Sequence, residues 1–197
     1  MPRLQNLSSD AGNLSTLTSR PNTALLVIDV QNGVVENAFN RDAVVGNIRS
    51  AVQKARDAEM PVIWVQHSDA ELEVDSPAWQ IVSELQPLPG EPLVRKNYKS
   101  SFIDTNLEEI LLKLKVSKLI VCGAESNHCI RHTSHSAFDR GYDVTLIADA
   151  HTANSYEWAG HKVSAEQVID EQNDNFSHYE MPAVSASVQP LASIDFA

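Results

Sequence analysis

The sequence predicts an α/β protein in which a mainly parallel, six-stranded sheet carries helices on both faces. The first observation is that short apolar runs alternate with amphipathic segments along the chain. The second is the run "ALLVIDV" at 24–30, whose unbroken apolar character is typical of a strand buried on both faces. The third is the absence of any internal repeat or low-complexity tract, so that 197 residues fit one domain.

Six strands are expected, each on an apolar run. They lie at 24–30, 61–67, 92–94, 118–123, 143–149 and 183–187. Pro61 opens the second of them, where a missing N–H costs least. Because helical segments separate the strands, we expect a parallel sheet with right-handed crossovers.

Helices are expected between these strands. They lie at 42–58, 106–115, 128–140 and from Ser164 to about 179, with a short one around Ala78–Leu85. Residues 42–58 carry apolar side chains at helical spacing. Thr105-x-x-Glu108 and Ser164-x-x-Gln167 match the capping box that begins a helix, and Gly141 is a helix stop.

Two segments stand apart from this alternation. Residues 1–22 are polar and rich in Ser, Thr and Asn, and we expect a loose N-terminal arm ahead of a single domain at 23–197. Residues 68–92 are acidic and contain four prolines. A loop of that length in a compact domain is often functional, and we expect it, with Trp79, to shape the substrate end of a site.

The composition excludes several classes of protein. A hydrophobic fraction of 43% with 21% charged residues is that of a globular chain. The net charge of −11, without a Lys/Arg cluster, argues against a nucleic-acid partner. No apolar run reaches the roughly 20 residues that cross a bilayer, and the N-terminus lacks the apolar core of a signal peptide. Two cysteines without such a signal favour reduced thiols and a cytoplasmic protein.

Polar residues follow several predicted strands, at the edge where open α/β sheets bind ligands. Asp29 ends the first strand, Lys96 follows the third, and Cys129 follows the fourth after a short loop. A carboxylate, an ammonium and a thiol are therefore expected at one edge of the sheet. Taken singly, Asp29 is equally consistent with a cap of the next segment, and Lys96 is better explained as a solvated surface group.

Cys129 is the discriminating residue because it lies at the start of a predicted helix. Free N–H groups and the helix dipole there favour an anion, so we expect a lowered thiol pKa and an available thiolate. The same N–H groups can stabilise an oxyanion. Cys122 lies inside an apolar strand and is expected in the core.

Other kinds of site are disfavoured. His128, His132 and His135 share one face of a predicted helix, but no familiar ligand spacing accompanies them, so we expect no metal. The chain contains no G-x-G-x-x-G, no P-loop and no G-x-S-x-G, which argues against a dinucleotide or ATP cofactor and against a serine hydrolase.

Three separated segments resemble the isochorismatase-like cysteine hydrolases. They are "LLVIDVQNG" (25–33), "VRKNYKSSFIDTNLEEIL" (94–111) and "VCGAESNHCIRHTSHSAFDRGYDVTLIADAHTA" (121–153). Their order and spacing agree with the family along roughly 24–188. The resemblance implies a Rossmann-like, three-layer α/β/α domain and a homo-oligomer, either a dimer or a tetramer.

The resemblance also implies the site. An Asp–Lys–Cys triad falls on Asp29, Lys96 and Cys129, with Lys96 six residues before the family's phenylalanine, here Phe102. A cis peptide is implied between Ala124 and Glu125, so that the N–H groups of Glu125 and Cys129 form an oxyanion hole. The Asp-x-His metal motif of the nicotinamidases is missing from "QHSDAELEVD", which argues against nicotinamide and against a metal.

These residues predict a hydrolase that cleaves a C–N bond of a small amide-like substrate through a thioester on Cys129. Its cavity walls are expected at Gln31, Phe39, Phe102 and His128. One alternative is the vinyl-ether cleavage of true isochorismatases, which needs no cysteine nucleophile. Another is a non-catalytic binding or assembly module, which the polar arm and the His-rich helix would suit.

Overall fold

A computed structural model describes residue 17 and residues 19–196, and it has the expected fold class. One sheet contains six strands in the order β3-β2-β1-β4-β5-β8, and every neighbouring pair is parallel. The strands are β1 (Asn22–Ile28), β2 (Val62–His67), β3 (Leu93–Lys96), β4 (Val116–Ala124), β5 (Asp143–Thr152) and β8 (Ala186–Gln189). Most of the predicted N-terminal arm lies outside the described residues.

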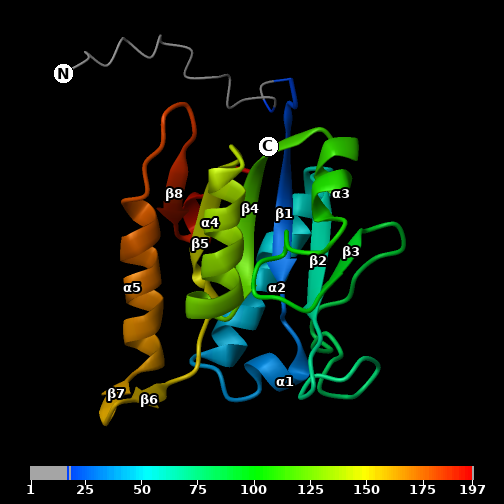
Figure 1. Ribbon diagram of the computed structural model, residues 1–197. Coiled ribbons are helices and arrows are strands. Elements are labelled where there is room, and N and C mark those ends of the chain that lie inside the picture. The colour runs from blue at the N-terminus through cyan, green and yellow to red at the C-terminus, as the bar shows by residue number, and fades with distance from the viewer. Residues whose placement is uncertain (1–16, 18, 197) are drawn as a thin grey trace, which may run out of the picture.

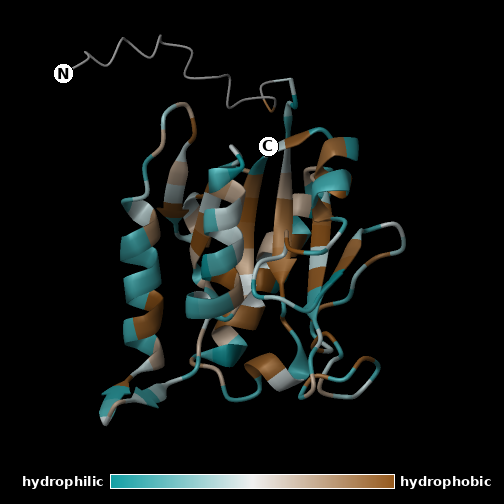
Figure 2. Cartoon of the chain, in the orientation of Figure 1, coloured by the Kyte–Doolittle hydropathy of each residue, from teal (hydrophilic) through white to brown (hydrophobic). Residues whose placement is uncertain are grey.

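Helices cover both faces of this sheet (Figure 1). One face packs against α2 (Arg41–Asp57), and the other against α3 (Leu107–Lys113), α4 (Arg131–Asp139) and α5 (Ala165–Ser177). The centre of β1 is buried, and its side chains alternate between the two apolar clusters: Leu25 faces α2, whereas Leu26 faces the other helices. Figure 2 shows the consequence, with apolar strands inside and hydrophilic outer faces on α4 and α5.

The six strands lie within three residues of their predicted ends; the largest shift is that of the last strand, Ala186–Gln189 in place of 183–187. The capping box of Ser164 and Gln167 is formed in both directions. The box predicted at Thr105 is not formed: the helix begins after Asn106, and the Thr105 hydroxyl donates to the Ser101 carbonyl. No helix in the described residues combines the length and apolarity needed to cross a membrane.

The short helix predicted around 78–85 is wrong. This stretch consists of turns, and Ile81 forms an isolated bridge with Gln31. Its backbone carbonyls accept from the N–H groups of Asn32 and Gly33 at the start of α1 (Asn32–Val35), a one-turn helix that the sequence pattern did not reveal. Tertiary hydrogen bonds therefore replace helical ones here. An exposed hairpin of β6 (Tyr156–Trp158) and β7 (His161–Val163) was also not predicted.

The predicted helix at 128–140 begins earlier, with a π-helical turn at Ser126–Ile130 that continues into α4. This turn is tied to the structure behind it by a buried chain of polar side chains. The Ser126 hydroxyl lies 2.7 Å from Nδ1 of His151, and Nε2 of His151 lies 2.8 Å from Oδ1 of Asn173 on α5. His151 thus joins β5 and α5 to the loop that follows β4.

Gly123 permits the close contact of β4 with β1 that precedes this loop. Its φ is +127°, and a Cβ there would lie 2.0 Å from the carbonyl oxygen of Ile28. Residues other than glycine rarely adopt that backbone conformation. The carbonyl oxygen belongs to a central strand, so moving it away from an added Cβ would disrupt the sheet.

We expect Gly123→Ala to lower the free energy of unfolding by about 3 kcal/mol or more, because backbone strain and overpacking combine. The matched control is Gly46→Ala on α2, where an added Cβ has nothing within 4 Å. That change should raise stability by about 0.5–1 kcal/mol. Urea unfolding of both variants tests this, and a Gly123→Ala protein as stable as the control would contradict it.

Burial lowers the pKa of His151 to about 4, so the folded protein keeps this imidazole neutral where an unfolded chain takes up a proton. Its contribution to stability is full above the ordinary histidine pKa and is lost as the pH falls toward 4. The free energy of unfolding should therefore drop by about 2 kcal/mol between pH 7 and pH 5 through this residue.

Urea titrations of wild type and His151→Gln across this range measure the effect. The difference in stability between the two proteins should shrink by that amount on acidification. His178→Gln, at the exposed end of α5, is the control and should run parallel to wild type. Parallel curves for His151→Gln as well would refute the assignment.

Candidate active site

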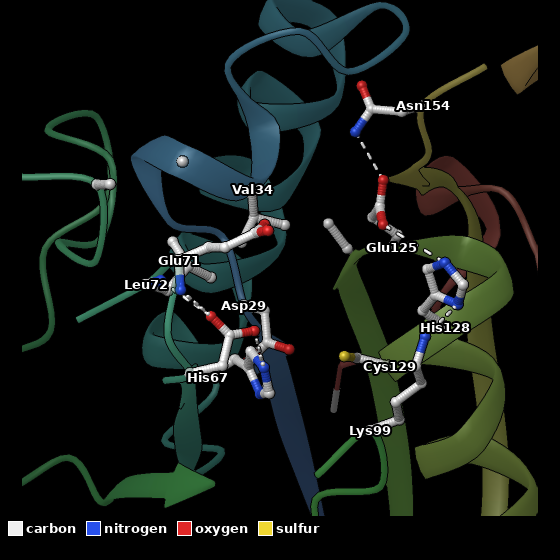
Figure 3. A pocket seen from close by; sticks show the side chains of 14 residues that line it. Asp29, Val34, His67, Glu71, Leu72, Lys99, Glu125, His128, Cys129 and Asn154 are labelled. Atoms are coloured by element: carbon white, nitrogen blue, oxygen red, sulfur yellow. Dashed lines mark hydrogen bonds and ion pairs between the residues drawn. The ribbon is translucent and has the colours of Figure 1, made fainter. Parts of the chain in front are cut away.

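A cavity of about 570 Å³ opens at the carboxyl edge of the sheet. One wall comes from α1 and from the loop after β2, and the other from the π-helical turn after β4 (Figure 3). The lining residues are Asp29, Gly33, Val34, His67, Asp69, Glu71, Leu72, Ala78, Lys99, Ala124, Glu125, His128, Cys129 and Asn154. This is the edge at which polar residues were expected.

Asp29 and Lys96 form a buried ion pair at the floor of this cavity. Lys96 Nζ lies 2.6 Å from Asp29 Oδ2, and the two side chains are 0% and 1% exposed. Asp29 directly follows β1 and has a φ of 49°, a left-handed conformation that aspartate tolerates better than most residues. Lys96 ends β3, two strands away. The sheet order therefore brings together two residues that are 67 positions apart.

Cys129 completes the group. Lys96 Nζ donates to its Sγ at 3.2 Å, and the thiol faces the Asp29 carboxylate across the cavity (Figure 3). The structure thus gathers Asp29, Lys96 and Cys129 in one place, as expected from their positions at strand ends. Cys122 is fully buried in the core, also as expected.

The pKa of the Cys129 thiol differs from the expectation. Burial and the negative Asp29 together raise it to about 12, although Lys96 opposes both effects. Desolvation of the thiolate therefore outweighs the favourable start of the helix. Burial also raises the pKa of the Asp29 carboxyl, although Lys96 counteracts it. Thiol and carboxylate compete for one proton beside a fixed positive charge.

His67 is a neighbour of this group that the sequence pattern did not single out. Its Nδ1 lies 3.3 Å from Lys96 Nζ, and its Nε2 lies 3.0 Å from Asp69 Oδ2. The sequence does place His67 at the end of the second predicted strand. That position alone does not predict which residues it contacts.

The opposite wall carries a second chain of polar contacts (Figure 3). Lys99 Nζ lies 2.7 Å from His128 Nδ1, and His128 Nε2 lies 3.9 Å from Glu125 Oε2. Glu125 also accepts from the Asn154 amide at 2.6 Å. Burial and the positive Lys99 lower the pKa of His128, which favours a neutral ring that accepts from Lys99. The cis peptide expected between Ala124 and Glu125 is present.

Of the expected wall residues, only His128 lines the cavity. Gln31 is fully buried, and its amide bonds both to His67 and to the Trp79 carbonyl. Phe39 is about one-third exposed outside the cavity, and Phe102 packs near Tyr142 and under Arg140. Gln31, Phe39 and Phe102 are close to the motif residues in the sequence, but they do not line the cavity.

The loop at 68–92 does contribute to the cavity, through Asp69, Glu71, Leu72 and Ala78. Trp79 is not exposed to it: its ring is buried, with the Arg95 guanidinium 5.3 Å from the ring centre. Its carbonyl accepts from the amides of Gln31 and Gln66. Trp79 therefore anchors the loop to the core and does not line the cavity. Within the described residues, no group of three His, Cys, Asp or Glu side chains is placed to hold a metal ion.

Comparison with known proteins agrees with this geometry. The sequence model of the Isochorismatase domain matches residues 23–170. A streptothricin hydrolase of Streptomyces noursei is 36% identical over 138 residues, which cover 67% of this chain and 55% of that protein. The chain thus spans about half the length of this relative. The ureidoacrylate amidohydrolase RutB of Cronobacter sakazakii is 27% identical over 188 residues, which cover 70% of this chain and 81% of that protein.

Solved structures give the same result. The crystal structure of a cysteine hydrolase from Pseudomonas syringae pv. phaseolicola superimposes with a TM-score of 0.79 at 25% identity, covering 87% of this chain and 89% of that one. The residues that the domain model matches, 23–170, include all three residues gathered at the edge of the sheet. With the domain model matching most of its length, the chain belongs to the isochorismatase family.

Proposed function

We propose that the protein is a cysteine-dependent hydrolase that cleaves a C–N bond of a small amide-like substrate through a thioester. The observation that carries the proposal is the position of Lys96 Nζ, 2.6 Å from Asp29 Oδ2 and 3.2 Å from Cys129 Sγ, at the floor of a cavity. The names of two relatives, a streptothricin hydrolase and a ureidoacrylate amidohydrolase, support hydrolysis and the amide class.

The first step is proton transfer from Cys129 to Asp29. A thiol pKa raised to about 12 keeps the proton on Cys129 at rest, and the ammonium of Lys96, 2.6 Å from Asp29 Oδ2, favours the ionised carboxylate. Transfer leaves a thiolate and a neutral carboxyl, and Lys96 stabilises the negative charge on whichever atom carries it. A raised carboxyl pKa makes Asp29 a stronger base than an exposed aspartate.

The thiolate then adds to the substrate carbonyl carbon, and the carbonyl π electrons move onto oxygen. The backbone N–H groups of Glu125 and Cys129 are the proposed donors to this oxyanion, each worth about 3–4 kcal/mol in such sites. The tetrahedral intermediate collapses when its C–N bond breaks. Asp29 returns the proton to the leaving nitrogen, which departs as an amine or ammonia, and the acyl group remains on sulfur.

Hydrolysis of the thioester reverses these roles. Asp29, again ionised, accepts a proton from a water molecule while the water oxygen adds to the acyl carbon. When the C–S bond breaks, the proton passes to sulfur, and the acid product leaves the regenerated thiol. A cavity of about 570 Å³ fits a small-molecule substrate.

The setting of this activity is also part of the proposal. Both cysteines are free thiols, in keeping with a reducing, cytoplasmic compartment. We infer a homo-oligomer, a dimer or a tetramer, because of the family to which the chain belongs. Neither nucleic acid nor membrane has a part in this function.

Replacing the proposed nucleophile tests the mechanism. Cys129→Ala should lose at least about a thousandfold in turnover of any amide that wild type hydrolyses, because no thioester can form. Cys122→Ala is the matched control and should keep turnover within about twofold at a modest cost in stability. Ammonia release from a panel of small amides and ureas, with mass spectrometry of trapped acyl-enzyme, provides the measurement.

The outcomes separate the alternatives. Equal turnover by wild type and Cys129→Ala would exclude the thioester route. A vinyl ether cleaved by both proteins would favour the isochorismatase-type reaction, and binding without turnover of any panel member would favour a binding module.

The pH dependence tests Asp29. Its raised pKa means that the carboxyl takes up a proton, and loses its function as a base, at a higher pH than an ordinary carboxyl with a pKa near 4. The acid limb of kcat/KM should therefore lie above that value, and activity should be full only on its alkaline side. Asp29→Asn should abolish turnover rather than move the limb. A limb at the ordinary carboxyl pKa would refute the role.

A further inference from the structure

We propose that His67, oriented by Asp69, is a positioning residue that fixes the Lys96 ammonium between Asp29 and Cys129. This inference rests on the proposed function, since it assigns a task within the same site. His67 acts through Lys96 and takes no part in bond making or breaking.

The first step of the argument is the number of donors on Lys96. An ammonium has three N–H donors and no acceptor. Three acceptor atoms lie close to Nζ: Asp29 Oδ2 at 2.6 Å, Cys129 Sγ at 3.2 Å and His67 Nδ1 at 3.3 Å. The Lys96 side chain is fully buried, so water does not replace a missing partner. His67 is therefore the third acceptor that the ammonium requires.

The second step concerns the state of the imidazole. Nδ1 accepts from Lys96 only if it carries no proton, so the ring proton must lie on Nε2. Asp69 Oδ2 lies 3.0 Å from Nε2 and accepts that proton's hydrogen bond. The carboxylate of Asp69 thus selects the tautomer that presents a lone pair to Lys96.

The third step concerns the carboxylate. Asp69 Oδ1 accepts from the backbone N–H groups of Leu72 and Glu71, at 2.9 and 2.8 Å. Together with the contact to His67, these hydrogen bonds lower the pKa of Asp69. The acceptor of the imidazole proton is therefore held both in place and ionised by the loop that follows β2.

The fourth step concerns the backbone. His67 is paired with Lys96 in the register of β2 and β3. Its N–H donates to Gln31 Oε1 at 2.8 Å, and its carbonyl accepts from Gln31 Nε2 at 2.9 Å. A buried amide thus clamps the peptide on both sides. This gives Gln31 a task in the site, although it does not line the cavity.

A merely structural role would look different. The His67 side chain is 16% exposed, whereas residues that fill the core are buried, and it borders the cavity rather than an apolar cluster (Figure 3). Charged groups surround it on each side: Asp69 on the loop, Lys96 on β3 and Asp29 after β1. Such a place suits the orientation of a charge.

Two substitutions of His67 separate the acceptor from the bulk of the ring. Asn places a carbonyl oxygen near the position of Nδ1, whereas Leu fills similar space without an acceptor. Leaving a buried ammonium proton unpaired costs enough to change reactivity about tenfold. Asp69→Asn removes the selection of the tautomer, and His178→Leu on the exposed end of α5 is the matched control.

The readout is the rate at which iodoacetamide labels Cys129 as a function of pH, measured by mass spectrometry on the folded protein. Buried Cys122 is an internal reference. We expect His67→Leu to slow labelling at pH 7 at least about tenfold and to move the profile to higher pH. His67→Asn should restore the rate to within about threefold of wild type, and Asp69→Asn should fall between the two.

With an amide that wild type hydrolyses, kcat should fall most in His67→Leu, less in Asp69→Asn and least in His67→Asn. KM should change little, because Lys96 acts on the nucleophile. A His67→Leu protein that is less stable but keeps the wild-type labelling profile would overturn the proposal. Equal losses in the Leu and Asn variants would do so as well, because the acceptor would then not matter.

Cys129→Ala shows whether the role of His67 or the proposed function itself has failed. If Cys129→Ala retains turnover, the thioester mechanism fails whatever His67 does. If Cys129→Ala is inactive and His67→Leu behaves as wild type, the mechanism stands and only the role of His67 fails.

Discussion

The buried ion pair of Asp29 and Lys96 is the constraint on which the rest of the site depends. Two charges removed from water are costly, and removing one partner of such a pair commonly costs 3–5 kcal/mol because the other is left alone. Their contact at 2.6 Å exists because β3, β2 and β1 are neighbours whose carboxyl ends meet at one edge. The order of strands in the sheet therefore decides the electrostatics of the cavity floor.

Burial explains both the strength of this arrangement and the state of the thiol. The same exclusion of water that tightens the contact of Lys96 with Asp29 penalises a free thiolate, so the pKa of Cys129 rises. A thiol that is protonated at rest suits a nucleophile whose base lies beside it. In the proposed mechanism the negative charge moves between carboxylate and sulfur while the ammonium stays fixed, so that the site would never hold two uncompensated anions.

The sequence predicted the parts of the structure that depend on hydrophobic pattern and on the general geometry of parallel sheets. Unbroken apolar runs located the strands, and the meeting of strand ends located Asp29, Lys96 and Cys129. It could not predict features decided by tertiary contacts. Turns replace a helix at 78–85 because the carbonyls there bond to α1, and the pKa of Cys129 follows its burial rather than the start of its helix. The exposed β6–β7 hairpin leaves no apolar alternation to detect.

Different buried hydrogen bonds hold the two walls of the cavity in place. They fix some of its side chains and leave others free to vary. Gln31 clamps the peptide of His67 on one side, and His151 ties Ser126 to α5 on the other. Neither clamp reaches the loop side chains of Glu71 and Leu72, which border the cavity without a side-chain hydrogen bond among the described contacts. The sheet thus fixes the side chains of Asp29 and Lys96, and the turn anchored by His151 fixes Cys129. Glu71 and Leu72 can therefore change their side chains without disturbing these contacts, and we expect them to influence which substrate binds.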